Sequence, residues 1–395
     1  MNKLSAIFWW LYIAVSPVYW VPLIGVATFS FFKIFLIAVA AITASLTLIT
    51  EKRITLPFGY LGMFGFFILC FSFLPGVIGG TPGAGYKMLL NVFYSFTTFI
   101  AIALLYQKNQ RLVEHLSYTG FIIGALCFYV VLAGQGVVEN YRSPINLGGF
   151  PVSVSGFTGL RTGWSNGTAF FIPFLIYLAF HKKSYIIKAL CIACICSIFL
   201  SQVTVAGRNG MLASVLGAFL MLYFMKKRLL LMLFGFVILV LALVYLPLLL
   251  EHLRFDRIES SASVDDFNKF SAGRLESYYY ALSIILKNPV FGVGFGNTDI
   301  AGHSIHNMVL RYTAETGIIF LFVFLGLVAA GLYKLYPFRN NPAACVPMVV
   351  IIQGVLESQF EPGVLLGSFQ NSALWWACVG IAGAISVKPS LGHIK

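Results

Sequence analysis

A polar stretch from Arg274 to Gly317 carries residues that could do chemistry within an otherwise very apolar sequence. Arg274 opens this stretch and His306 lies near its end, while Arg208 precedes it between two apolar runs. A guanidinium group binds phosphate through two parallel hydrogen bonds, and a histidine with an unperturbed pKa of about 6.5 suits a proton acceptor at neutral pH. These residue types predict stabilisation of anionic charge by arginine and proton abstraction by histidine.

Three other patterns in the polar segments have both a chemical and a structural interpretation. His303 and His306 form an H-x-x-H pair, but no third metal ligand follows at a suitable spacing. Asp265 and Asp266 could hold a divalent cation, although adjacent acids in a loop are more often solvated. The GVGFGN segment at 292–297 lacks the last glycine of a nucleotide-binding fingerprint and favours a tight turn that redirects the chain. We therefore expect no metal and no cofactor.

Other charged residues in this region also allow two interpretations. Arg208 lies in TVAGRNGMLAS, where two apolar runs leave almost no loop, so its guanidinium must lie at or just inside the membrane boundary. A charge there is costly and usually functional, and the alternative is an arginine that snorkels from a helix end. Arg311 and Glu315 are four residues apart and are most simply an ion pair on one helix. His306 is either a base or the cap of a helix that begins near Asn307.

Composition sets the class of protein. The chain has 395 residues, of which 59% are hydrophobic and only 10% charged, and it contains repeated apolar runs of bilayer-spanning length. The net charge of +13 does not indicate nucleic-acid binding, because the basic residues form short clusters at the ends of apolar runs. The cysteines lie in or beside these runs and are typical of membrane-core packing. The sequence predicts an all-α polytopic membrane protein with a single integral membrane domain spanning residues 1–395.

The apolar runs and the basic clusters together predict a topology. Counting about 20 residues per span gives about twelve transmembrane helices. With both termini in the cytoplasm, the basic clusters share one side, and two long loops at 135–166 and 251–313 face the periplasm. The second loop contains an amphipathic pattern near 274–287, which we place along the outer membrane surface. The apolar runs lie at roughly 4–20, 28–50, 57–79, 88–106, 117–134, 167–181, 185–204, 209–225, 229–250, 314–333, 343–357 and 368–386.

Four motifs occur in an order that resembles the O-antigen polymerase and ligase superfamily of bacterial envelope glycosyltransferases. They are R-N-G at 208–210, G-R at 273–274, N-P-x-x-G-V-G-F-G-N at 288–297 and H-N-x-x-L-x(6)-G at 306–317. The resemblance covers roughly residues 150–335 in detail. It implies a GT-C-like helical bundle and a glycan donor carried on undecaprenyl pyrophosphate. It also implies that Arg208, Arg274 and His306 are the catalytic residues, although many members have S-R-G where this chain has G-R-N.

The demands of that reaction fit the same residues. Breaking a bond between a sugar and a lipid pyrophosphate expels a multiply charged leaving group, which Arg208 and Arg274 can neutralise without a metal. His306 can take the proton from the attacking sugar hydroxyl. The predicted substrate-binding residues are Arg142, Arg161, Tyr278, Asn307 and Arg311.

The resulting prediction is an inner-membrane O-antigen polymerase of lipopolysaccharide biosynthesis. It would move a growing glycan from undecaprenyl pyrophosphate to the non-reducing end of a lipid-linked repeat unit at the periplasmic face. The expected partners are these lipid-linked donor and acceptor glycans, the bilayer and a chain-length regulator protein, with no nucleic acid.

Two other functions stay open. An O-antigen ligase uses the same donor with lipid A-core as acceptor, and the spacing from His306 to Gly317 also resembles ligases. The short chain and the segment EPGVLLGSFQNSALWW at 361–376 favour the polymerase. A twelve-helix transporter is a third alternative, but the connection at 181–184 is too short for the central link between two six-helix halves.

Overall fold

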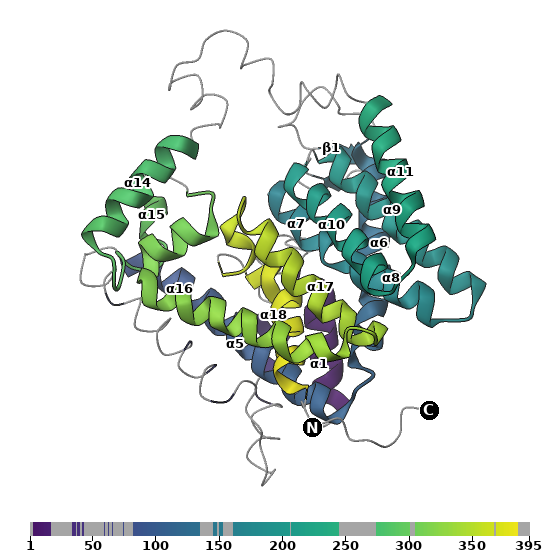
Figure 1. The fold of residues 1–395 in the computed structure, drawn as a ribbon, viewed down its shortest axis with the longest axis horizontal. Coiled ribbons are helices and arrows are strands. Elements are labelled where there is room, and N and C mark those ends of the chain that lie inside the picture. The colour runs from purple at the N-terminus through teal and green to yellow at the C-terminus, as the bar shows by residue number, and fades with distance from the viewer. Residues whose placement is uncertain are drawn as a thin grey trace.

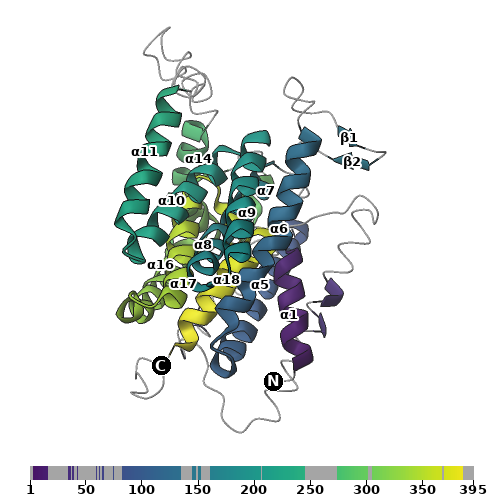
Figure 2. The same ribbon diagram turned by 90° about the vertical axis from the view of Figure 1, so that its right-hand side faces the viewer.

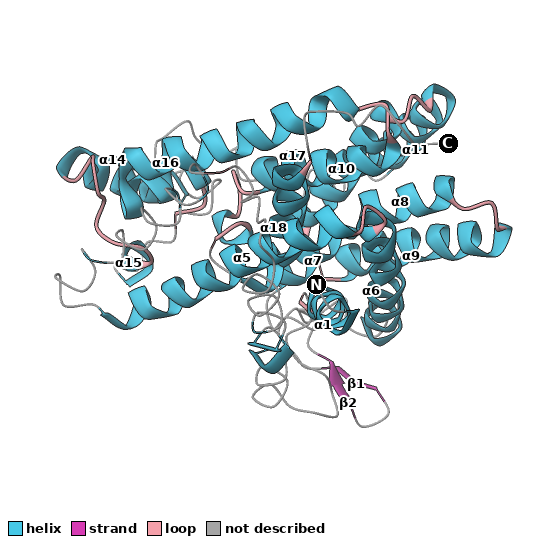
Figure 3. Ribbon diagram, turned by 90° about the horizontal axis from the view of Figure 1, so that it is seen from below, coloured by secondary structure: helices cyan, strands magenta, loops and turns pink. Residues whose placement is uncertain are grey.

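The computed structural model describes residues 3–16, 82–134, 145–147, 150–152, 161–205, 207–244, 274–300, 305–366 and 369–385, with isolated positions between 34 and 74. Within these ranges the chain is almost entirely helical (Figure 3). The α-helices are α1 (Lys3–Val15), α5 (Pro82–Lys108), α6 (Leu112–Gly134), α7 (Arg161–Ala169), α8 (Phe171–His181), α9 (Tyr185–Thr204), α10 (Arg208–Phe224), α11 (Arg228–Val244), α14 (Arg274–Lys287), α15 (Asn297–Ile300), α16 (Met308–Leu335), α17 (Pro342–Glu357) and α18 (Phe369–Ala384). Two 3-10 turns are η3 (Tyr336–Phe338) and η4 (Pro362–Val364).

Several of these helices are apolar enough for a membrane. The segments Leu112–Leu132, Thr162–His181, Tyr185–Thr204 and Met308–Phe338 are long enough to cross a bilayer. The shorter apolar helices are Asn91–Gln107, Arg208–Phe224, Arg228–Val240, Pro342–Glu357 and Ser372–Ala384. The runs predicted at 28–50 and 57–79 lie mostly outside the described residues. The helical membrane class is confirmed, and the count of about twelve spans stays a prediction.

The first long loop differs from its prediction at 135–166. It contains an antiparallel hairpin of β1 (Ile145–Leu147) and β2 (Phe150–Val152), in which Leu147 is paired with Phe150. The two residues between these strands are Gly-Gly, a sequence typical of a tight hairpin turn. The loop also ends earlier than predicted, because α7 begins at Arg161 and its Trp164 is fully buried. The polar run RTGWSNG therefore belongs to the helical bundle.

The second long loop, predicted at 251–313, contains more helix than expected. The helix α14 covers the same residues as the amphipathic pattern, and α15 follows it. The helix predicted at 314–333 begins earlier, at Met308, because the side chain of Asn307 caps it there. The site residues of this region therefore lie on or beside defined helices.

The central pair α17 and α18 separates two groups of helices. In Figure 1, α14, α15 and the start of α16 lie on one side of this pair, and α6 to α11 lie on the other. The helix α17 contacts α8, α10 and α16, while α18 contacts α5, α7 and α16. The rings of Phe324 and Trp375 stack with centroids 5.9 Å apart, and Trp376 meets Trp375 edge-on at 5.0 Å. This aromatic core joins α16 to α18, and α17 contacts both α16 and α10, the helix that begins at Arg208.

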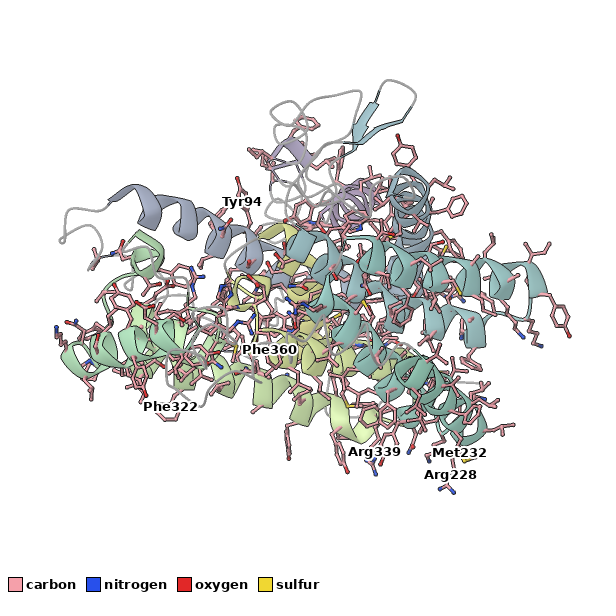
Figure 4. All side chains as sticks on the ribbon, turned by 90° about the horizontal axis from the view of Figure 1, so that it is seen from above. Tyr94, Arg228, Met232, Phe322, Arg339 and Phe360 are labelled. Carbon is pink, nitrogen blue, oxygen red and sulfur yellow. The ribbon has the colours of Figure 1, made fainter. Side chains whose placement is uncertain are left out.

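The outer faces of several helices are apolar and exposed. In Figure 4, Met232 of α11 and Phe322 of α16 project from the ribbon, and their exposed fractions are 65% and 66%. Figure 2 shows α1 beside α6 at another outer face. Large apolar faces of this kind are unfavourable in water and suit contact with lipid acyl chains.

Two of the basic clusters lie near one edge. Arg228, at the start of α11, and Arg339, just after η3, project from the same edge of the molecule in Figure 4. Both belong to clusters that the positive-inside pattern assigns to the cytoplasm. The assignment of these clusters to the cytoplasm stays a prediction.

The helix α16 is broken at Gly317, which has φ 82° and ψ 168°. The break leaves the carbonyl groups of Ala314 and Glu315 available to other donors. The backbone N–H of Val293 donates to Ala314 O and that of Gly294 donates to Glu315 O, both at 2.9 Å. The glycine-rich segment thus docks on the break and satisfies groups that the helix leaves unpaired.

The docked segment is a tight turn, as predicted. Gly292, Gly294 and Gly296 all have positive φ values of 65°, 100° and 82°. A Cβ atom on Gly292 would lie 2.4 Å from the Glu315 carbonyl carbon, so the backbones approach too closely for a side chain. These glycines set the position of the chain that leads from α14 towards His306.

Replacing Gly317 with alanine is expected to destabilise the protein strongly. The new Cβ would lie 1.8 Å from Val290 O, and the positive φ is itself unfavourable for alanine. Each effect costs about 1–3 kcal/mol. Gly326 on the same helix is the matched control, because a Cβ there has nothing within 4 Å. The unfolding temperature of each variant would be measured in detergent, and we expect it to be lower for Gly317→Ala than for Gly326→Ala. Equal unfolding temperatures would contradict the strain assigned to Gly317.

Candidate active site

Arg208 is the first residue of α10, and close packing against α7 holds it there. The hydroxyl of Ser165 on α7 donates to Gly207 O at 2.7 Å. A Cβ atom on Gly207 or Gly210 would lie 2.2 or 2.1 Å from the Ser165 side chain. The glycines on either side of Arg208 and Asn209 therefore allow α10 to touch α7.

The position of Arg208 favours an anion. Its side chain is exposed at the helix N-terminus. A positive side chain at this end lies against the helix dipole, which is unfavourable by about 0.3–1 kcal/mol. The guanidinium and the backbone N–H groups of the first turn both attract negative charge. A bound phosphate would stabilise both.

The next residue, Asn209, connects α10 to the end of α17. Its side-chain amide donates to Glu357 O at 3.3 Å. The backbone N–H of Glu361 donates to the same carbonyl at 3.2 Å. The turn after α17, residues 358–361, therefore begins directly beside the N-terminus of α10.

This turn contacts the residues before α16. Oε2 of Glu361 lies 3.6 Å from Nδ1 of His306. The Asn307 amide lies 3.4 Å from both the backbone and side-chain oxygens of Gln359. The N–H of Met308 donates to a backbone oxygen of the same turn at 3.1 Å. Asn209 contacts the last residue of α17, Glu357, and His306 contacts the last residue of the turn, Glu361, so the two contact opposite ends of the segment 357–361.

The cap of α16 is Asn307, so the interpretation of His306 as that cap is wrong. The Asn307 side chain accepts a hydrogen bond from Leu310 N at 3.1 Å. Asn307 has the extended backbone and the short acceptor side chain that an N-cap requires, whereas His306 precedes it. Helix capping therefore leaves the imidazole of His306 available for another role.

The helix α14 contacts His306 from another side. The hydroxyl of Tyr278 donates to His306 O at 3.3 Å. Arg274 is four residues before Tyr278, so the two residues share a face of α14. Both are partly buried. A series of contacts between neighbouring residues therefore runs from Arg208 through the turn after α17 and His306 to the face of α14 that carries Arg274.

Residues 189–325 match the model of a family described as O-antigen ligase. The resemblance to the O-antigen polymerase and ligase superfamily is confirmed. No curated protein matches the chain. The matched region begins in α9 and ends in α16, and it contains Arg208, Arg274 and His306. The match to this family model indicates a glycosyltransferase-like enzyme of lipopolysaccharide biosynthesis, and it gives no support to the transporter alternative.

Within the superfamily region, Arg311 forms the predicted ion pair. Its Nε donates to Glu315 Oε1 at 3.1 Å, and the carboxylate also accepts a hydrogen bond from the Thr298 hydroxyl. Arg311 is 8% exposed and Glu315 is fully buried. The pair joins α15 to α16, so Arg311 has a structural role, and its contact with substrate stays a prediction.

The side chains of several candidate site residues lie outside the part of the chain that the structure describes. Arg161 begins α7, with only its backbone described. The positions Arg142, His303, Asp265 and Asp266 lie outside the described residues. In the part of the chain that the structure describes, no group of three or more His, Cys, Asp and Glu side chains is arranged to hold a metal.

Two acids at the end of α17 and in the turn after it were not among the predicted site residues. Glu361 faces the imidazole, and Glu357 is only 3% exposed, with neither carboxyl oxygen hydrogen-bonded within the described residues. The sequence signal was a pair of acids four apart in VLESQFEPG, at the end of a strongly apolar run. Buried acids in such a position are unusual and often functional.

Proposed function

We propose that this chain is an O-antigen polymerase. It transfers a growing glycan from undecaprenyl pyrophosphate to the non-reducing end of a lipid-linked repeat unit at the periplasmic face of the inner membrane. The observation that carries this proposal is a series of contacts along residues 357–361. His306 lies against Glu361 at one end, and Asn209, next to Arg208, donates to the Glu357 carbonyl at the other.

In this proposal the two arginines stabilise the leaving group. Pyrophosphate gains negative charge as its bond to the anomeric carbon breaks. Arg208, at the α10 N-terminus, and Arg274, on α14, approach the site from opposite sides of the α17–α18 pair. Two planar guanidinium groups can each bind phosphate oxygens at two points.

His306 is the proposed general base. As the acceptor hydroxyl attacks the anomeric carbon, the imidazole takes its proton, and the bonding electrons leave with the pyrophosphate. Its side chain is 33% exposed, so one edge of the ring is accessible to a substrate. Tyr278 and Asn307 are proposed to bind the glycan, together with Arg142, Arg161 and Arg311.

The acceptor distinguishes the polymerase from its nearest alternative. The description of the matching family, O-antigen ligase, favours a ligase, which would transfer the glycan to lipid A-core. The short chain and the polymerase-like segment at 361–376 favour the polymerase. The first residue of this segment, Glu361, lies against His306.

Deletion of the gene separates these two functions. Lipopolysaccharide from the deletion strain would be resolved on a gel. Core carrying a single repeat unit is expected for a polymerase, because the ligase still attaches unpolymerised units. Bare core would contradict the polymerase and support the ligase.

The proposed transfer needs no metal, because arginines carry the leaving-group charge. Activity of the purified protein is therefore expected to persist in excess EDTA. Loss of activity that magnesium or manganese restores would contradict this mechanism and would favour a metal site at Asp265 and Asp266. The assay would follow consumption of the lipid-linked repeat unit.

A further inference from the structure

A carboxylate lies beside the imidazole of His306 and is not needed for any step proposed so far. Glu361 Oε2 is 3.6 Å from His306 Nδ1, and the two side chains are 29% and 33% exposed. Nδ1 itself is buried and has no hydrogen-bond partner within the described residues. A buried ring nitrogen without a hydrogen-bond partner is unfavourable unless a nearby group can pair with it.

The backbone around His306 is held in place by two different elements. Tyr278 of α14 donates its hydroxyl hydrogen to His306 O at 3.3 Å. Two residues later, Met308 N donates to Ser358 O at 3.1 Å. The attachment point of the imidazole is therefore fixed relative to the turn after α17.

The backbone around Glu361 is held equally well. Its N–H donates to Glu357 O at 3.2 Å, and the following residue is Pro362, whose ring limits the chain. The carbonyl of Pro362 accepts a hydrogen bond from the buried Tyr312 hydroxyl at 3.0 Å. Since Tyr312 belongs to α16, the helix that follows His306 also fixes the residue after Glu361.

This geometry determines which ring nitrogen can act as a base. A neutral imidazole carries one N–H and one free lone pair, and the hydrogen bond at one nitrogen sets which is which. A carboxylate beside buried Nδ1 favours the proton there, which leaves the Nε2 lone pair free. The distance of 3.6 Å exceeds that of a hydrogen bond, and such contacts commonly shorten when substrate binds.

We propose that Glu361 is a positioning residue for His306. Its carboxylate accepts a hydrogen bond from Nδ1–H and fixes the tautomer in which Nε2 receives the proton of the acceptor hydroxyl. After that transfer, the carboxylate stabilises the imidazolium and does not itself take the proton. This inference rests on the proposed function, because it requires His306 to be the base.

The test compares Glu361→Gln in two backgrounds, using single-turnover transfer of a lipid-linked repeat unit. In the wild-type background, we expect a rate about 10–100-fold lower, with the concentration for half-maximal rate changed less than about threefold. In the His306→Gln background, we expect the same change to alter the residual rate less than about twofold, since the partner is absent.

Two further variants serve as controls. Glu361→Asp keeps a carboxylate and should recover part of the rate. Glu114→Gln, an acid-to-amide change at the start of α6, is the control and should leave the rate unchanged.

Each outcome decides a different point. A wild-type rate for Glu361→Gln, while His306→Gln is inactive, would overturn the positioning role and leave the base intact. An equal fold-loss in both backgrounds would also overturn it, because a structural defect acts without His306. A fully active His306→Gln variant would overturn both the base and the positioning residue. Elution of each variant as a folded protein in size-exclusion chromatography shows that the rates belong to intact protein.

Discussion

Replacing His306 with glutamine is expected to slow glycosyl transfer by about two to four orders of magnitude. Glutamine keeps a hydrogen-bonding side chain of similar reach but has no nitrogen that accepts a proton near neutral pH. Expression, membrane insertion and donor binding should stay near the wild-type level, because Asn307 and not His306 caps α16. Rates measured with purified protein and binding measured with donor lipid would separate the chemical step from assembly.

The neighbouring histidine supplies the control for this experiment. His303 is three residues away in the same polar segment, and His303→Ala is expected to have a much milder effect. If His306→Gln polymerises like the wild type, or if His303→Ala is the inactive variant, the assignment of the base is wrong.

Alanine at Arg208 or at Arg274 is expected to lower the rate by about two to three orders of magnitude each. Each change removes a fixed positive group from the departing pyrophosphate. Lysine at either position should restore only part of the rate, since an ammonium group cannot make the planar two-point contact. Steady-state kinetics of all four variants would measure these losses.

The surface arginine Arg339, which follows η3, supplies the matched control for these variants. Arg339 lies over the Tyr336 ring at 4.3 Å and donates to the Tyr336 carbonyl at 3.2 Å. Arg339→Ala removes the same charge from the protein, and its rate should stay within about twofold of the wild type. Full activity in both lysine variants would show that a point charge is enough and that bidentate binding is unnecessary.

The helices were predictable because a bilayer imposes a length on each apolar run. The runs at 185–204 and 209–225 correspond closely to α9 and α10, and the short link between them placed Arg208 at a helix end. The polar start of α7 was not predictable in this way. Its sequence RTGWSNG reads as loop, and only its packing against Gly207 and Gly210 shows why it is buried.

The candidate site was predictable in its residue types and not in its contacts. The arginine and histidine assignments came from motif order, and the Arg311–Glu315 pair came from helical spacing. Glu361 is 55 positions from His306 in the sequence. No periodicity connects two residues so far apart, so their contact emerges only when α16 packs against the end of α17.

The most direct test of the proposed function uses the purified protein with undecaprenyl-pyrophosphate-linked repeat unit as its only glycan substrate. We expect lipid-linked products that carry two or more repeat units, with release of one undecaprenyl pyrophosphate for each unit added, as measured by mass spectrometry. Failure to consume the substrate until lipid A-core is added would contradict the polymerase, because it would identify core as the acceptor.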